Sequence, residues 1–419
     1  MDNVTLTNIS LAKHKGQIKG TITPPSSKSE SNRVLVIHAL AGKKGELQNL
    51  SNARDTQTMI RLLQQDNEET WDVLDAGTTM RFLTAYSAVS TKKRIMTGTL
   101  RMKERPILLL VDALRTLGAD ISYQEKEGYP PILIKPFDPK QVKTNTLTIR
   151  GDVSSQYITA LLMIAPLLPQ GLKLELTGKI GSKPYIEMTL QLMQKFGVTA
   201  KWEGSTITVP HQPYKGTTYN VESDGSAASY WFSMAALAPS ANFYIKGYKS
   251  DSLQGDRVIT SIMEKMGVKS TFTDKGLHLE KIVDFVAKPF EQDFTDCPDL
   301  AQTVAVVAAA QGQEVTMNGL ESLRIKETDR IAAIQNELRK FGSDLEEIIK
   351  DDSYKVVPGN FKMNYQHIAT YKDHRMAMAF APLALLGELS IENPEVVEKS
   401  YPHFWEDLKT LGFSLDVRH

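Results

Sequence analysis

The stretch LMQKFGVT (192–199) carries the pattern that decides the fold. An apolar-periodic helix leads into it, Gly197 ends that helix, and a strand-like segment follows. Four further copies read LRTLGAD (114–120), IMEKMGVK (262–269), ELRKFGSD (337–344) and DLKTLGFS (407–414). A glycine in this place suits the left-handed residue that closes many helices, where a Cβ would cost energy. We therefore predict a helix end followed by a strand at each copy.

These copies divide the chain into repeats. Gly197 and Gly267 lie 70 residues apart, and a period of about 70 divides the 419-residue chain into about six repeats. The first repeat carries only a degenerate copy, RLLQQDN (61–67). The segments between the copies are rich in β-forming residues, namely YPPILIKP (129–136), TLTIRG (146–151), STITVP (205–210) and YKVVPG (354–359). Each repeat therefore mixes helices with several strands.

A second class of helix is apolar on all sides. Its members are SSQYITALLMIAPLL (154–168), SAASYWFSMAALA (226–238), DLAQTVAVVAAA (299–310) and HRMAMAFAPLALL (374–386). Such helices are expected inside a domain rather than on its surface, and a solenoid of these long repeats would leave them without surrounding neighbours. We expect an α/β protein of two globular domains, each of three repeats, with a ligand site in the cleft between them.

Charge and cysteine content exclude several classes of protein. Forty-nine basic residues balance forty-nine acidic ones, so no overall field attracts nucleic acid or an anionic membrane. The single cysteine, Cys297, excludes an intrachain disulfide framework or a multi-thiolate metal site. The longest apolar run, MAMAFAPLALL (376–386), is too short to span a bilayer, and MDNVTLTNIS (1–10) does not read as a secretory signal. These features favour the cytoplasm.

Cations gather at predicted helix starts, which favour anions. In the first half they are Lys28 and Arg33 beside Ser29, Arg81 after Gly77, and the group Arg101, Lys103 and Arg105. Solvated helix starts and capped turns are the alternative. Ser154, Ser155 and Gln156 exceed what one helix cap needs.

The second half carries acids as well. On one helix, Lys326 and Arg330 would share a face. Asp299 precedes an apolar helix, as an N-cap or as a proton acceptor among cations. Asp373, His374 and Arg375 open another such helix, and Lys399 follows. The sequence contains no GxxxxGK[ST], HExxH or CxxC, so we expect neither a phosphate loop nor a metal.

Seven motifs in order resemble the enolpyruvyl-transferase family, from about residue 20 to 405. They are SSKSESNR (26–33), DAGTTMRF (75–82), RMKERP (101–106), SSQYITALL (154–162), SKPYIEMTL (182–190), RIKETDR (324–330) and DHRMAMAF (373–380). The resemblance implies two domains of three βαβαββ-like repeats each. Domain I would hold residues 1–20 plus 226–419, with the phosphoenolpyruvate side, and domain II residues 21–225, with the sugar-phosphate side.

The resemblance also implies an activity. The chain would join the 5-hydroxyl of shikimate 3-phosphate to phosphoenolpyruvate through a tetrahedral intermediate, releasing phosphate, in aromatic amino-acid biosynthesis. No cofactor, nucleic acid or membrane is implied, and a monomer is expected. The implied contacts of shikimate 3-phosphate are Lys28, Ser29, Arg33, Ser154, Ser155, Gln156, Ser182, Asp299 and Lys326. Those of phosphoenolpyruvate are Lys28, Gly77, Arg101, Gln156, Arg330, Arg375 and Lys399.

The implied proton-transfer residues are Asp299, Glu327 and Lys28. Asp299 is the candidate base for the 5-hydroxyl, whereas Glu327 and Lys28 remain alternatives for the proton at C3. Arg forks match carboxylates and phosphates, which explains the number of cations.

Three positions depart from the family pattern. Asp75 stands for Asn and is expected to pair with a neighbouring cation, Phe82 stands for Pro and could alter the pocket, and Ser322 stands for Asn. Gly77 would leave room for glyphosate in the phosphoenolpyruvate pocket.

Three alternative functions remain: the sister enzyme acting on a UDP-amino sugar, an RNA 3′-phosphate cyclase, and a non-catalytic anion-binding protein. The sister enzymes usually carry a reactive loop cysteine, whereas Cys297 lies beside Asp299.

Overall fold

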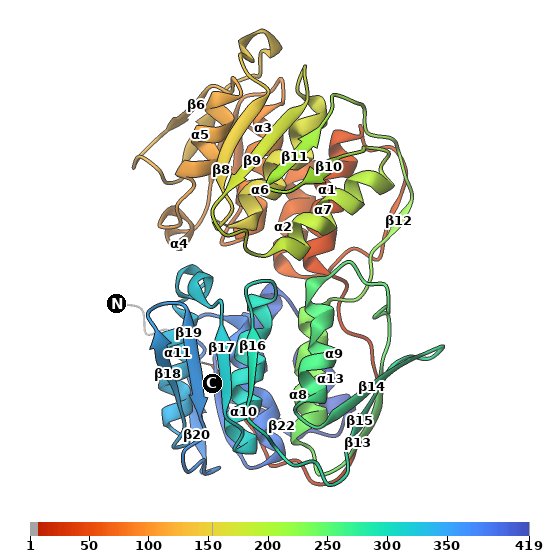
Figure 1. Ribbon diagram of the computed structural model, residues 1–419, viewed down its shortest axis with the longest axis vertical. Helices are drawn as coiled ribbons and strands as arrows, with labels where there is room; N and C mark the ends of the chain where they lie inside the picture. Colours follow the sequence, from red (N-terminus) through yellow and green to blue (C-terminus); the bar gives the residue numbers. More distant parts are fainter. Residues whose placement is uncertain (1–6, 153, 419) are drawn as a thin grey trace. The chain divides into compact units, whose positions relative to one another are not determined.

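The computed structural model describes residues 7–152 and 154–418. The chain forms two compact units (Figure 1). Unit 1 contains the chain up to Pro25 and from Glu222 onward, and unit 2 contains Ser26–Val221. Residues 1–6 and 419 of the predicted domain I, and Val153 of the predicted domain II, lie outside the described residues.

Five four-stranded sheets in the described residues share one topology, in which a parallel pair continues into two antiparallel strands. In unit 1 the sheets are β14-β15-β13-β2, β16-β17-β19-β18 and β20-β21-β1-β22. In unit 2 they are β4-β5-β7-β6 and β10-β11-β9-β8, together with a parallel pair, β12-β3. The predicted βαβαββ-like repeat is therefore present in both units.

The strand bounds of unit 1 are β1 (Asn8–Leu11), β2 (Ile18–Ile22), β13 (Ala241–Ile245), β14 (Val268–Thr273), β15 (Gly276–Lys281), β16 (Phe290–Asp293), β17 (Val315–Asn318), β18 (Asp344–Ile349), β19 (Ser353–Val357), β20 (Gln366–Ile368), β21 (Leu389–Glu392) and β22 (Leu415–Arg418). Those of unit 2 are β3 (Leu47–Gln48), β4 (Thr70–Asp72), β5 (Arg94–Thr97), β6 (Ile121–Tyr123), β7 (Ile132–Ile134), β8 (Thr146–Arg150), β9 (Leu172–Thr177), β10 (Lys201–Glu203), β11 (Thr206–Val209) and β12 (Tyr219–Asn220). The four β-rich stretches of the sequence are β7, β8, β11 and β19, as predicted.

The helices of unit 2 are α1 (Lys28–Leu40), α2 (Arg54–Gln64), α3 (Gly77–Ala88), α4 (Leu100–Lys103), α5 (Leu108–Thr116), α6 (Ser155–Ile164) and α7 (Lys183–Lys195). Those of unit 1 are α8 (Gly225–Leu237), α9 (Ile259–Glu264), α10 (Ala301–Gln311), α11 (Arg330–Arg339), α12 (His374–Phe380) and α13 (Phe404–Thr410). None of the helices in the described ranges is long and apolar enough to cross a membrane.

The predicted helix-closing glycines are confirmed. Gly118, Gly197, Gly267, Gly342 and Gly412 have φ of +93°, +81°, +85°, +81° and +90°. They follow α5, α7, α9, α11 and α13, and each is followed by a strand. In the degenerate copy, Gln65 has φ −82°, so that helix does not close through a left-handed residue.

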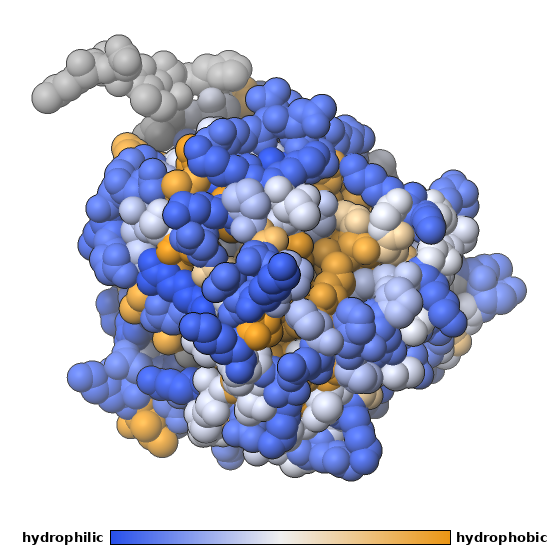
Figure 2. Space-filling view, turned by 90° about the horizontal axis from the view of Figure 1, so that it is seen from above, coloured by the Kyte–Doolittle hydropathy of each residue, from blue (hydrophilic) through white to orange (hydrophobic). Residues whose placement is uncertain are grey.

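The all-round apolar helices are buried, as predicted. Every residue of α8 is buried, and α8, α10 and α12 pack against one another in unit 1. In unit 2, α1, α3 and α6 pack together in the same way. Burial of each large apolar side chain, such as Phe232, stabilises the fold by about 1.5–3 kcal/mol. The surface in Figure 2 is mostly hydrophilic, with apolar side chains visible near the centre of the view.

The N-terminal ends of these six buried helices carry polar and charged side chains or a glycine. Lys28 begins α1, Gly77 begins α3 and Gln156 lies in the first turn of α6. In unit 1, Ser226 and Arg375 lie in the first turns of α8 and α12, and Asp299 lies two residues before the start of α10. Helix N-termini carry exposed backbone donors and a partial positive charge, so both units present surroundings that suit anions.

Candidate active site

Arg330 is the centre of a charged cluster in unit 1. Its side chain is 2% exposed, and its guanidinium donates hydrogen bonds to three carboxylates. Nη1 lies 3.0 Å from Asp299 Oδ1, Nη2 lies 2.8 Å from Glu327 Oε2, and Nε lies 2.7 Å from Asp373 Oδ2. Burial alone would lower the pKa of Arg330, but the three acids raise it above its usual range. The guanidinium is therefore a permanently charged hub.

Asp299 lies between two guanidinium groups. It belongs to the 3-10 helix η4 (Pro298–Leu300), and its Oδ2 accepts a hydrogen bond of 2.8 Å from Arg375 Nη2. The N-cap alternative is wrong, because α10 begins at Ala301 without a side-chain cap. Burial would raise the pKa of Asp299, but Arg375, Lys326 and Arg330 lower it well below its usual range. Asp299 is consequently ionised at neutral pH.

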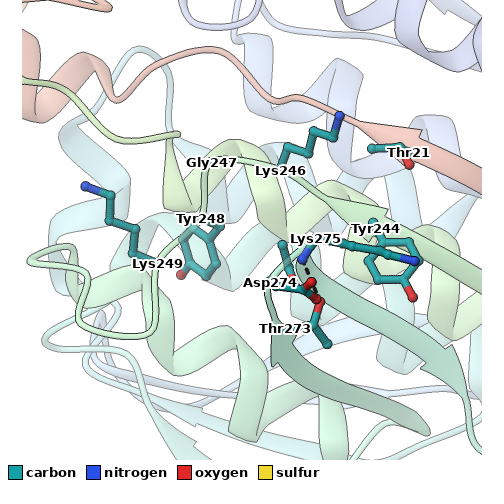
Figure 3. Close-up of a pocket in the computed structure, with 10 residues that line it drawn as sticks. Thr21, Tyr244, Lys246, Gly247, Tyr248, Lys249, Thr273, Asp274 and Lys275 are labelled. Atoms are coloured by element: carbon teal, nitrogen blue, oxygen red, sulfur yellow. Dashed lines mark hydrogen bonds between the residues drawn. The ribbon is translucent and has the colours of Figure 1, made fainter.

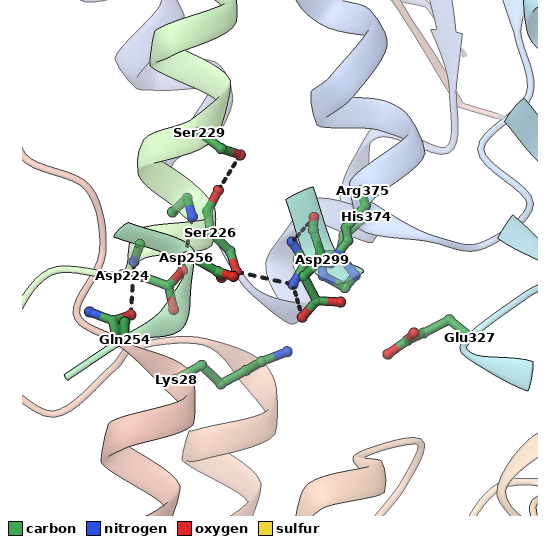
Figure 4. Close-up of polar contacts among 12 residues, drawn as sticks. Lys28, Asp224, Ser226, Ser229, Gln254, Asp256, Asp299, Glu327, His374 and Arg375 are labelled. Carbon is green, nitrogen blue, oxygen red and sulfur yellow. Dashed lines mark hydrogen bonds and ion pairs between the residues drawn. The ribbon is translucent and has the colours of Figure 1, made fainter. Parts of the chain in front are cut away.

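Arg375 contacts two further side chains of unit 1. Its Nη1 lies 3.2 Å from Tyr230 Oη. Its Nη2 lies 3.4 Å from Ser226 Oγ (Figure 4). The backbone N–H of Arg375 donates to Asp373 Oδ1, the N-cap of α12, at 2.9 Å. Asp373 thus binds both Arg375 and Arg330, while the adjacent His374 is buried.

Two lysines complete the cluster. Lys399, buried at the end of η7 (Pro394–Lys399), places Nζ 4.0 Å from Glu327 Oε1. Burial lowers the pKa of Lys326, although Asp299 and Glu327 act in the opposite direction.

The prediction that Lys326 and Arg330 share a helix face is wrong, because Asp329 caps α11 and the helix begins at Arg330. The predicted residues of unit 1 nevertheless form one cluster: Asp299, Lys326, Glu327, Arg330, Arg375 and Lys399.

In unit 2, the first of the predicted site residues is Lys28, at the start of α1. Ser27 caps α1 and accepts a hydrogen bond of 3.3 Å from Glu30 N. Lys28 Nζ lies 3.3 Å from Asp55 Oδ2 at the start of α2. Asp55 was not predicted from the sequence as a partner of Lys28. An acid in the first turn of an amphipathic helix has an ordinary stabilising role, so its position gave no signal.

Arg33 is enclosed by its own unit. Its side chain donates from Nε to Thr189 Oγ1 at 2.9 Å and from Nη1 to the Ser29 carbonyl at 2.7 Å. The guanidinium also lies 5.4 Å from the centre of the Phe82 ring. Burial lowers the pKa of Arg33 to about 10. These contacts hold Ser29 in place, and a direct substrate contact of Arg33 stays a prediction.

Gly77 lies against Arg105. A Cβ on Gly77 would lie 2.6 Å from Arg105 Nη1, so the first turn of α3 can approach this guanidinium only because residue 77 is glycine. Arg101, in contrast, is exposed and pairs with Glu104 at 3.0 Å. The structure therefore joins Gly77 to Arg105, which the sequence grouped with Arg101 and Lys103 but left out of the predicted site.

The residues at the start of α6 include a helix cap and a side chain that contacts α3. Ser154 caps the helix by accepting a hydrogen bond of 3.4 Å from Gln156 N. The Gln156 side chain donates to Thr78 Oγ1 at 3.2 Å and so joins the starts of α6 and α3. Ser155 begins α6, and Ser182 precedes α7 in the left-handed region, with φ +54°. The starts of α3 and α6 thus adjoin in unit 2.

Two of the departures from the family pattern have a structural account. Asp75 pairs with Arg54 at 3.2 Å, which confirms the predicted partner cation. Phe82 is fully buried beneath Arg33. Ser322 lies in η5 (Glu321–Ile325), and its effect on a sugar-phosphate contact stays a prediction.

Cys297 is 3% exposed, and burial raises the pKa of its thiol. A thiol in such surroundings is a poor nucleophile. Within the described ranges, no group of three or more His, Cys, Asp or Glu residues is placed to hold a metal ion.

A separate hollow of about 830 Å³ lies at one end of sheet β14-β15-β13-β2. Lys246, Lys249 and Lys275 line it, but their amines point in different directions (Figure 3). None of the predicted site residues lines this hollow. Its lysines do not converge as an anion site requires.

Comparison with known proteins identifies the family of this chain. The fold and the clustered cations agree with the enolpyruvyl-transferase resemblance. A family model described as EPSP synthase (3-phosphoshikimate 1-carboxyvinyltransferase) matches residues 12–70 and 65–408. The chain belongs to the EPSP synthase family.

Relatives and solved structures agree. A 3-phosphoshikimate 1-carboxyvinyltransferase of Bacteroides fragilis is 47% identical over 406 residues, covering 96% of this chain and 97% of the relative. One of Pasteurella multocida is 37% identical, covering 93% and 94%. The EPSP synthase structure from Acinetobacter baumannii has a TM-score of 0.81 at 20% identity, covering 99% and 100%. That last likeness supports the fold alone.

Proposed function

We propose that the chain transfers the enolpyruvyl group of phosphoenolpyruvate to the 5-hydroxyl of shikimate 3-phosphate. The products are 5-enolpyruvylshikimate 3-phosphate and phosphate. Family membership over nearly the whole chain supports this reaction. The observation that carries the mechanism is the Asp299 carboxylate, which is ionised between Arg330 and Arg375 in the same cluster as Glu327.

The proposed chemistry is an addition followed by an elimination. Asp299 accepts the proton of the 5-hydroxyl while the oxygen adds to C2 of phosphoenolpyruvate and C3 gains a proton. The tetrahedral intermediate then loses phosphate from C2, and C3 returns a proton. Glu327 or Lys28 transfers the C3 proton. Acid–base catalysis of this kind contributes about 10²–10⁴-fold.

Both substrates carry a phosphate and a carboxylate, so each needs several cations. We propose that phosphoenolpyruvate is bound by Lys28, Gly77, Gln156, Arg330, Arg375 and Lys399, with Arg105 in place of Arg101. We propose that shikimate 3-phosphate is bound by Lys28, Ser29, Arg33, Ser154, Ser155, Gln156, Ser182, Asp299 and Lys326.

Substrate binding also activates the base. Without substrate, both oxygens of Asp299 accept hydrogen bonds from guanidinium groups, which makes it a weak base. A substrate anion that binds Arg375 or Arg330 neutralises part of this positive charge, and the pKa of Asp299 rises. Asp299 therefore becomes a stronger base once substrate is bound. Binding of both substrates in a fixed orientation lowers the activation barrier further.

In this proposal the reaction needs no cofactor, and a single chain carries it out. The reaction takes place in the cytoplasm. A phosphate-release assay with each substrate omitted in turn tests it. We expect release only when both substrates are present. Release from phosphoenolpyruvate alone, or with a UDP-amino sugar as acceptor, would refute the proposal.

A further inference from the structure

Asp256 is a buried acid next to the cluster in unit 1. It lies in the 3-10 helix η3 (Gly255–Val258) and is 4% exposed. Its Oδ2 accepts a hydrogen bond from the Ser226 hydroxyl (Figure 4). Its Oδ1 accepts none from the described part of the chain. A carboxylate buried with so few partners is costly, so its presence calls for a physical reason.

Capping of α8 does not supply that reason. Asp224 already caps the helix, and its Oδ1 accepts a hydrogen bond of 2.8 Å from Ala227 N. Gly225 lets Asp256 approach the first turn, because a Cβ on residue 225 would lie 3.2 Å from Asp256 Cβ. The helix start is thus shaped to admit a second acid that the cap does not need.

Ser226 connects Asp256 to Arg375. A serine hydroxyl has one hydrogen, which Ser226 donates to Asp256 when that carboxylate is ionised. The lone pairs of Ser226 Oγ then face Arg375 Nη2, which lies 3.4 Å away and also donates to Asp299 Oδ2 at 2.8 Å. The path therefore runs from Asp256 through Ser226 and Arg375 to the candidate base.

The surroundings decide the charge of Asp256. Burial raises its pKa to about 7, and the negative charges of Asp299 and Asp224 act in the same direction. The Ser226 hydrogen bond and Arg375 oppose this rise. Two other titratable groups, Cys297 and Tyr248, have their own pKa values raised by burial and by Asp256. Asp256 therefore changes charge near neutral pH, whereas Asp299 remains ionised.

We propose that Asp256 is a positioning residue whose charge, transmitted through Ser226, sets how strongly Arg375 is held away from an anionic substrate. When Asp256 is ionised, it attracts Arg375 and reduces the positive charge offered to the substrate. When Asp256 is protonated, Arg375 is released toward the substrate anion. This inference rests on the proposed function, in which Arg375 binds phosphoenolpyruvate.

The test compares the KM for phosphoenolpyruvate of the parent enzyme with that of Asp256→Asn from pH 6 to 8.5. The asparagine keeps the size and can still accept the Ser226 hydrogen bond, but it cannot become charged. We expect the ratio of the parent KM to the variant KM to lie near 1 at pH 6 and to rise to about threefold or more at pH 8.5. The ratio cancels titration of the substrate phosphates, which affects both proteins equally.

A second variant and two controls complete the test. Ser226→Ala removes the connecting hydroxyl, raises the pKa of Asp256 further and should also flatten the pH dependence, even if Asp256→Asn does not fold. Asp251→Asn, an exposed acid in the same loop, and Ser229→Ala, one turn further along α8, should keep the parent profile. A KM ratio that is independent of pH, or that falls as pH rises, would overturn the proposal. An inactive parent enzyme would instead refute the proposed function.

Discussion

Arg330 Nη1 lies 3.0 Å from Asp299 Oδ1, which places the candidate base on the most buried cation of the cluster. The same guanidinium binds Glu327 and Asp373, so three carboxylates share one hub. Such a group is costly to bury unless every charge has a partner. The three acids hold Arg330 in place, and Asp299 also holds Arg375.

Replacement of Asp299 by asparagine tests the proposed base. The amide of Asp299→Asn keeps the size of the side chain but cannot accept the proton of the 5-hydroxyl. We expect kcat to fall by about 10²–10⁴-fold while the KM for phosphoenolpyruvate changes much less. Phosphate release under saturating substrates measures this loss. The exposed neighbour Asp296 provides the matched control, Asp296→Asn, which should retain normal turnover. Near-normal turnover of Asp299→Asn removes Asp299 from the role of base.

Two arginines of the same motif should differ in importance. Arg105 lies against Gly77, whereas Arg101 is exposed and paired with Glu104. Arg105→Ala should therefore raise the KM for phosphoenolpyruvate by about tenfold or more, as expected for loss of a charged hydrogen-bond donor. Arg101→Ala serves as the control and should stay near the parent value. The opposite ranking in steady-state kinetics would restore Arg101 to the site.

Gly77 should control the position of Arg105. A methyl group on residue 77 would lie 2.6 Å from Arg105 Nη1, so Gly77→Ala must displace the guanidinium. We expect this variant to raise the KM for phosphoenolpyruvate and, by the same displacement, to weaken inhibition by glyphosate. An inhibition titration of the parent enzyme should show competition with phosphoenolpyruvate. Glyphosate that binds without such competition would contradict this account of the pocket.

Asp256 should make folding stability depend on pH. Its raised pKa, about 7, means that the folded protein keeps a proton that the unfolded chain loses near pH 4. Stability from this group is therefore full below pH 4 and is lost as pH rises through 7. Asp256→Asn abolishes the effect, so its Tm should exceed that of the parent protein at pH 8 by more than it does at pH 5. A Tm difference that stays constant between these two values would show that Asp256 does not titrate as described.

Cys297 should be unreactive in the folded enzyme. Its thiol is buried, and its pKa is raised by burial and by neighbouring acids led by Asp256. Iodoacetamide should leave activity unchanged under native conditions, and Cys297→Ala should retain turnover. Rapid inactivation by the reagent, prevented by substrate, would instead favour a catalytic cysteine.

The repeats could be predicted because their signals are local. A glycine such as Gly197 suits a left-handed helix end whatever the rest of the chain does, and an all-apolar helix such as α8 is stable only when buried. The polar contacts made by residues within the apolar segments, however, were not predicted. Ser226 and Tyr230 lie in the buried helix α8, yet both contact Arg375.

The site was harder to predict than the fold, because its contacts join distant segments. Asp299 could have been a helix cap, and only the positions of Arg330 and Arg375 decide that it forms ion pairs instead. The choice between Arg101 and Arg105 depends on the turn that α4 makes over four residues. Asp256 follows Gln254 and Gly255 in a loop without a recognisable motif, so spacing alone gave no reason to select it.

The most direct measurement follows the phosphorus atoms by ³¹P NMR during turnover with both substrates. The proposed reaction predicts that the phosphoenolpyruvate signal disappears as inorganic phosphate appears in equal amount, while the sugar phosphate remains as an ester with a new chemical shift. The signals should be unchanged when either substrate is absent. Retention of the phosphoenolpyruvate signal, or release of the phosphate of shikimate 3-phosphate, would contradict enolpyruvyl transfer by this chain.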